Sequence, residues 1–187
     1  MLIRPFAFAL ASVACSLASL GCGGGHPAAK ATPPKVEPAI DAPSALADAA
    51  RALAGTWRCS GSVYGPDGAA ASEVTVDVRL DGGLDEAWLQ TVFAVASGKY
   101  KYKFTSYRTF DSSSSKWVNV IVDNLRGHAV SRSTDGVTWT GDSSGPIGTM
   151  KIRDTETIVA PGKVKMVGQY SLDGSNWSTG YDLSCDK

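Results

Sequence analysis

The chain has 187 residues, and its 18 basic residues balance its 18 acidic ones. A chain without net charge has no excess of basic surface for nucleic acid or an anionic surface, so neither is an expected partner. Once a leader and a linker are set aside, about 135 residues remain, which is enough for one hydrophobic core but not for two.

Residues 1–21 have the pattern of a lipoprotein signal peptide. Arg4 gives a positive start, and residues 6–20 carry no charge. An apolar run of about 15 residues is too short for a comfortable membrane span and matches the middle of a secretory signal. The segment from Ser19 to Cys22 resembles a bacterial lipoprotein processing site, in which the Cys is lipidated and becomes the first mature residue.

Lipidation of Cys22 predicts stable anchoring, because a diacylated Cys inserts more than one chain into the bilayer. Gly23 rather than Asp follows it, and by resemblance to sorted lipoproteins this favours the outer membrane, on either its periplasmic or its surface face. The alternative is an ordinary signal peptide with a chance Cys, cleaved elsewhere. Either way, the leader predicts a protein of the cell envelope.

Residues 22–43 predict a flexible linker, because three glycines and five prolines interrupt any regular element. Residues 44–55 then predict one short helix, with Ser44 as its N-cap and Gly55 at its end. An isolated helix of this length is marginal in water. We therefore expect it to pack against an apolar surface of the domain that follows.

From Trp57 onward the hydrophobic pattern has a period of two, which is typical of antiparallel strands with one wet face. Turn signals such as Asp-Gly separate the strands at nearly regular intervals. Evenly spaced hairpins with no helix between them predict an all-β domain within residues 44–187. Its strands form an antiparallel up-and-down meander that closes into a barrel of about 8–10 strands. The expected strands are 56–64, 72–80, 86–96, 99–110, 116–124, 127–134, 137–143, 150–159, 163–172 and 176–185.

Two of the hairpins repeat one pattern. Residues 133–139 and 171–177 both have the sequence Ser-x-Asp-Gly-x-(Thr/Asn)-Trp. The pattern predicts a strand, a tight Asp-Gly turn and a Trp that seals the hairpin.

Two of the four cysteines are left for the folded domain, because Cys15 leaves with the leader and Cys22 is lipidated. In an oxidising compartment, the remaining Cys59 and Cys185 predict one disulfide. Such a bridge requires the first and last strands to lie side by side, as they do in a closed barrel. The alternative is two free thiols; a metal site is weaker, because two cysteines cannot fill four positions.

The segment Gly55-Thr-Trp57, before a β meander with a C-terminal Cys, resembles the start of the lipocalin-like (calycin) barrels. That resemblance implies that Trp57 closes one end of the barrel. In lipocalins an Arg near the last strand packs on this indole, and here no Arg follows Arg153. Further motifs resemble a bacterial family of unknown function with the same architecture; they are Gly82-Gly83 before Trp88, Phe110-Asp111 before Trp117, and residues 142–146 followed by Arg153-Asp154.

The inward face of such a barrel is a candidate ligand cavity, since ten strands can enclose space as well as a packed core. Aromatic and apolar residues alternate inward, and Arg108 and Asn119 fall on the same face. A mostly apolar pocket with a few polar groups suits a small hydrophobic ligand. The candidate cavity residues are Trp57, Val76, Leu89, Phe93, Tyr100, Tyr102, Phe104, Arg108 and Asn119.

The sequence offers little for catalysis, a metal or a cofactor. His128 is the one His of the predicted domain, and an exposed turn position explains it better than a catalytic or haem-binding role. Asp154 and Glu156 share one face of a strand, and paired carboxylates can exchange protons. Because Arg153 and Thr155 make that strand polar on both faces, we expect a solvated face instead.

Three functions are left to compare. The first is binding of a small hydrophobic ligand without catalysis. The second is an envelope structural or protein-interaction module with a packed barrel, which would use an outer face such as the lysine stripe (Lys99, Lys101, Lys103); the protein partner is not indicated. The third and weakest is an enzyme that acts on a small molecule in the barrel.

Overall fold

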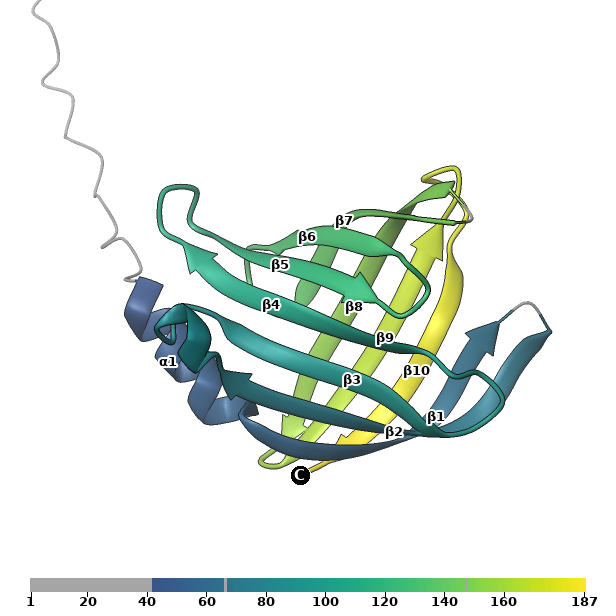
Figure 1. Ribbon diagram of the computed structural model, residues 1–187, viewed down its shortest axis with the longest axis horizontal. Helices are drawn as coiled ribbons and strands as arrows, with labels where there is room; N and C mark the ends of the chain where they lie inside the picture. Colours follow the sequence, from purple (N-terminus) through teal and green to yellow (C-terminus); the bar gives the residue numbers. More distant parts are fainter. Residues whose placement is uncertain (1–41, 66, 147) are drawn as a thin grey trace, which may run out of the picture. The chain divides into compact units, whose positions relative to one another are not determined.

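The computed structural model describes residues 42–65, 67–146 and 148–187 (Figure 1). The predicted signal peptide 1–21, the lipidation site Cys22 and the linker up to residue 41 lie outside the described residues.

The described chain forms one short helix followed by a closed antiparallel β-barrel (Figure 1). The strands follow the order β1-β10-β9-β8-β7-β6-β5-β4-β3-β2, so each strand pairs with its neighbours in the sequence and β10 returns to β1. This confirms the predicted all-β meander. The elements are α1 Ala42–Leu53, β1 Gly55–Gly65, β2 Gly68–Leu80, η1 Gly82–Leu84, β3 Leu89–Ser97, β4 Lys103–Asp111, β5 Lys116–Asp123, β6 His128–Ser133, β7 Thr138–Gly145, β8 Gly148–Ala160, β9 Lys163–Ser171 and β10 Ser178–Asp186.

The start of β4 differs from the prediction by four residues, because a side chain replaces the strand ladder there. The Asn124 amide accepts a hydrogen bond from the Lys103 backbone N–H at 2.9 Å and donates one to the Lys101 carbonyl at 3.0 Å. Lys99 and Lys101 therefore lie in the β3–β4 connection, and the prediction that the lysine stripe follows one strand is wrong. All three lysines are exposed, and Lys99 pairs with Asp67 at 2.8 Å.

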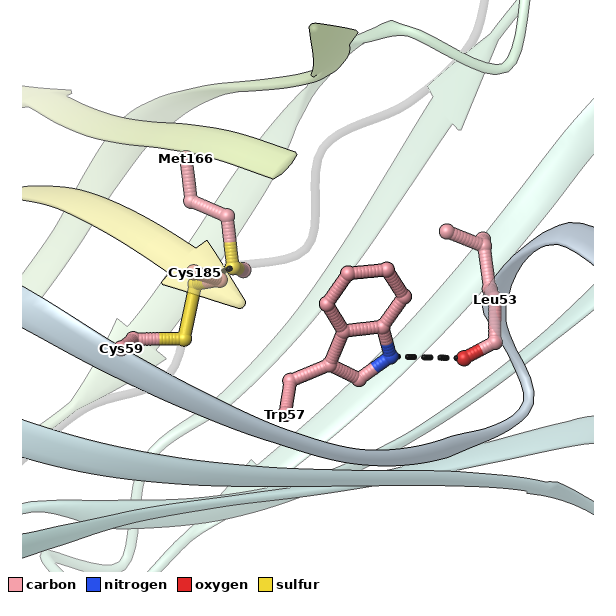
Figure 2. The surroundings of a disulfide bond; sticks show 5 residues. All are labelled: Leu53, Trp57, Cys59, Met166 and Cys185. Carbon is pink, nitrogen blue, oxygen red and sulfur yellow. Dashed lines mark hydrogen bonds between the residues drawn. A yellow bond between two sulfur atoms is a disulfide. The ribbon is translucent and has the colours of Figure 1, made fainter. Parts of the chain in front are cut away.

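The helix α1 packs on the end of the barrel where β2 and β4 finish (Figure 1). Leu46 and Ala50 are buried in the same apolar cluster as Trp57, and the Trp57 indole N–H donates a 2.7 Å hydrogen bond to the Leu53 carbonyl (Figure 2). The expectation that this helix packs on the apolar surface of the following domain is confirmed. Among the described residues, no helix is long and apolar enough to cross a membrane.

A disulfide closes the barrel between its first and last strands. Cys59 of β1 and Cys185 of β10 stand directly opposite each other in the ladder, 126 residues apart in the chain. Both cysteines are buried, and the Cys185 sulfur lies 3.6 Å from the Met166 sulfur (Figure 2). The predicted pairing is confirmed, together with the strand adjacency that it requires.

We predict that removing this disulfide destabilises the domain strongly. In the chain-entropy account, a cross-link that closes so long a loop contributes about 4–5 kcal/mol. Replacing both Cys59 and Cys185 by Ala should lower the free energy of unfolding by about that amount in urea titrations. A reducing agent should produce a similar loss in the unsubstituted protein and none in the double variant; equal stability of all samples would contradict the prediction.

Candidate functional site

The barrel encloses a cavity of about 510 Å³. This lies within the roughly 300–1,000 Å³ range of small-molecule sites. Its lining extends to the β5–β6 and β7–β8 turns, where Leu125, Gly127, Gly145 and Pro146 form the rim. In this meander those turns stand at the opposite end of the barrel from α1. The cavity is therefore approached from the end that the helix does not cover.

Four of the predicted cavity residues line this space: Tyr102, Phe104, Arg108 and Asn119. Trp57 and Val76 instead line a separate space of about 30 Å³ nearer α1. Because Arg108 and Glu156 border both spaces, this pair forms the floor of the larger cavity.

The other three predicted cavity residues do not border either space. Leu89 and Phe93 are fully buried in the apolar cluster, and the Phe93 ring stacks on Phe104 with 4.7 Å between centroids. Tyr100 lies in the β3–β4 connection, and its hydroxyl donates to the Gly68 carbonyl of the β1–β2 hairpin at 3.1 Å. In the ladder Leu89 pairs with Arg108 and Phe93 with Phe104, so both pack beside cavity-lining residues without bordering the cavity themselves.

The floor is an ion pair held inside the barrel. Arg108 of β4 donates two hydrogen bonds of 2.8 Å from its terminal nitrogens to the two Glu156 oxygens of β8. The two side chains are only 6% and 17% exposed. The guanidinium also stacks over the Trp139 ring at 4.8 Å. Burial alone lowers the pKa of Arg108, but the charge and hydrogen bonds of Glu156 more than reverse this and raise it.

Asp154 also lies on the inner face of β8, between Trp139 of β7 and Gly168 of β9 in the ladder. The Tyr181 hydroxyl of β10 donates a 2.9 Å hydrogen bond to its carboxylate. Burial raises the pKa of Asp154 to about 6, against the opposing effect of that hydrogen bond. The prediction that Asp154 and Glu156 form a solvated face is therefore wrong. The other face of β8 carries Arg153, whose guanidinium lies 4.5 Å above the Trp177 ring.

Two tyrosine hydroxyls complete the polar lining, and both donate to carboxylates. Besides the Tyr181–Asp154 bond, the Tyr102 hydroxyl donates to Asp123 at 3.3 Å. Burial is the main cause that raises the pKa of each tyrosine, and the neighbouring carboxylates raise it further. Both hydroxyls therefore keep their protons at neutral pH.

Several buried polar atoms near the floor have no hydrogen-bond partner within the described residues. These are Arg108 Nε, Asn119 Oδ1 and Trp139 Nε1 on cavity-lining residues, and Ser131 Oγ. Such atoms are costly to leave unpaired in a dry interior. Their side chains are more than nine-tenths buried, so the polar floor is enclosed by the barrel wall.

His128 is exposed and lies on the cavity lining as the first residue of β6. Across the described part of the chain, no three His, Cys, Asp or Glu side chains are grouped so as to hold a metal ion.

Sequence reasoning missed Glu156, Asp154, Tyr181 and Trp139 as cavity residues. A signal existed for Tyr181, because it precedes Leu183 and Cys185 at spacings of two and four on one strand and so shares their face.

We predict that Asp154→Asn stabilises the domain at neutral pH. The folded-state pKa of about 6 lies above the ordinary 3.8, so ionising Asp154 costs more free energy in the folded domain than in the unfolded chain. The contribution of this group to the free energy of unfolding is therefore largest below pH 4 and is lost as the pH rises through 6. A difference of two pKa units corresponds to about 3 kcal/mol. The variant should gain about 1–3 kcal/mol near pH 8 and little near pH 4 in urea titrations.

The matched control is Asp142→Asn, which alters an exposed ion pair with Lys151 and should change stability by less than about 1 kcal/mol. A gain for Asp154→Asn that is the same at both pH values would show that the effect does not come from its ionisation.

Neither a family model nor a curated protein matches this chain. The closed ten-stranded antiparallel barrel of the described residues is consistent with the lipocalin-like resemblance of the sequence.

Proposed function

We propose that the barrel binds a small, largely apolar molecule without transforming it. The observation that carries this proposal is the cavity of about 510 Å³ on the uncovered side of the barrel. Most of its wall is apolar, and a few fixed polar groups stand at its floor. Ligand sites in proteins commonly combine these two features, because the apolar wall supplies affinity and the polar groups orient the ligand.

Binding is favoured over catalysis by how the polar groups are used. Arg108 and Glu156 are engaged with each other, and Asp154 accepts from Tyr181. The alternative, an enzyme that acts on a small molecule, is favoured by one observation, a cavity carboxyl with a pKa near 6. Conversion of a bound compound that is abolished by Asp154→Asn would establish that alternative.

The second alternative is an envelope interaction module that uses the outer face of the barrel. The exposed Lys103 at the start of β4 supports it, whereas Lys99 and Lys101 lie in the β3–β4 connection and Lys99 is paired with Asp67. Crosslinking in intact envelopes, with Lys101 and Lys103 changed to Ser as the control, would identify such a partner.

We also propose that the domain is a lipocalin-like barrel. Gly55 and Trp57 open β1, and the Trp57 ring is buried at the end that α1 covers. The Lys187 ammonium lies 5.5 Å from the centre of this ring. A C-terminal Lys thus stands over the indole, which is the role that the resemblance assigns to an Arg.

Finally, we propose that Cys22 is lipidated and holds the barrel at the outer membrane through the linker up to residue 43. The pattern of the leader supports this, and so does the Cys59–Cys185 disulfide, because disulfides persist in oxidising compartments such as the periplasm.

The anchoring proposal predicts that Cys22→Ala releases the protein from the membrane. Wild-type cells fed a labelled fatty acid should yield a labelled protein in the outer-membrane fraction. The variant should lose the label and move to the soluble fraction. Cys15→Ala is the matched control, because that residue leaves with the leader, and it should behave as wild type; equal labelling of the Cys22→Ala variant would overturn the proposal.

The binding proposal predicts that filling the cavity abolishes ligand uptake. Ser143 lines the cavity on β7, whereas Thr140 of the same strand is exposed. Ser143→Trp should reduce binding of a neutral apolar fluorescent probe at least tenfold and remove any small molecule found by mass spectrometry of the purified protein. Thr140→Trp should leave both unchanged. Equal probe binding by the two variants would place the probe outside the cavity.

A further inference from the structure

Among the residues that line the cavity, carboxyl groups outnumber permanently positive groups. Among the residues that line it, Arg108 carries the only side chain that is always positive, whereas Asp123, Asp154 and Glu156 carry carboxyl groups. His128 is exposed at the entrance. The charge that a ligand meets therefore depends on which of these groups are already neutralised by one another.

Arg108 is a poor receptor for an anionic ligand. Both of its terminal nitrogens donate to Glu156 at 2.8 Å, and its guanidinium carbon lies 4.8 Å from the centre of the Trp139 ring. Bidentate pairs of this kind are strong and geometrically specific. An incoming carboxylate or phosphate would have to displace Glu156 and leave that carboxylate buried without a partner, which is strongly unfavourable.

Asp154 is in the opposite situation. Its hydrogen-bond partner is the Tyr181 hydroxyl, a neutral donor, and Arg108 is held by Glu156. Aromatic rings stand close by: Tyr102, Phe104, Trp139 and Tyr181 line the same cavity. A carboxylate that has no cationic hydrogen-bond partner, in a cavity lined by aromatic rings, offers a cation both a charge and cation–π contacts.

We infer that the cavity takes an organic cation, a molecule with an apolar body and one protonated amine that pairs with Asp154. This inference rests on the proposed binding function and specifies its ligand class. The amine supplies the positive charge that Asp154 lacks, and the aromatic walls enclose the apolar body. The Tyr181 hydroxyl keeps its bond to the carboxylate and fixes its orientation.

Binding of such a ligand depends on the protonation of Asp154. The ionisable groups that face it are Glu156 on β8, Arg108 on β4, Tyr102 just before β4 and Tyr181 on β10, while β7 and β9 place Trp139 and Gly168 beside it. Of these, the carboxyl of Asp154 has a pKa of about 6. An amine therefore binds the ionised form above that pH and loses its anchor below it.

Three naphthalene probes test the inference, because they share a naphthylmethyl body and carry a cationic, a neutral and an anionic head group: 1-naphthylmethylamine, 1-naphthalenemethanol and 1-naphthaleneacetic acid. Affinities are measured by fluorescence on the purified full chain with Cys22→Ser, so that no acyl chain competes for the cavity. At pH 8 the amine should bind at least tenfold more tightly than the alcohol, and the acid most weakly. The preference for the amine should shrink as the pH falls through 6, while alcohol binding stays constant.

Asp154→Asn should make the amine and the alcohol equal without weakening the alcohol, and it should abolish the pH dependence of amine binding. Asp142→Asn, on the outside of the barrel, is the matched control and should bind all probes as wild type does. If the alcohol binds and Ser143→Trp prevents it, but the amine has no advantage, the cation inference fails and the binding function stands. Tightest binding of the acid would assign the site to Arg108 instead, and no binding of any probe would overturn both proposals.

Discussion

The pairing of β1 with β10 is the constraint on which the rest of this structure depends. It removes both exposed edges of the meander, and the Cys59–Cys185 bridge links the two strands at directly opposed positions. Once the sheet is closed, every inward side chain is removed from bulk water except through the ends. Because α1 and Trp57 cover one end, water and ligands have the other end as their approach. The open cavity and its polar floor both follow from this closure.

Closure also explains why the buried charges of Arg108 and Glu156 are paired. A charge in a dry interior is costly unless it is paired and hydrogen-bonded, and Arg108 and Glu156 satisfy that condition with two parallel bonds. Asp154 satisfies it only partly, because its donor is a neutral hydroxyl. The burial that raises its pKa to about 6 also makes the ionised side chain unfavourable for folding. Asp154 therefore reduces the stability of the fold at neutral pH, and it lines the cavity.

Sequence reasoning succeeded where one physical signal had a single explanation. Alternation and Asp-Gly turns located all ten strands, and elimination of Cys15 and Cys22 left one possible disulfide. It failed on β8 because Arg153, Asp154, Thr155 and Glu156 are polar on both faces, so the alternation that identifies an inner face was missing. The start of β4 could not be predicted either, since it is set by the Asn124 amide from the next hairpin.

The Arg108–Glu156 pair has a structural effect beyond its own stability. It stands between the small space nearer α1 and the larger cavity toward the β5–β6 and β7–β8 turns. An apolar pair at this level could be compressed or moved by the surrounding side chains, whereas a bidentate ion pair that is stacked on Trp139 has a fixed geometry. The depth of the cavity is therefore set by directional bonds between β4 and β8. A ligand that reaches Asp154 meets a floor whose position does not depend on the ligand.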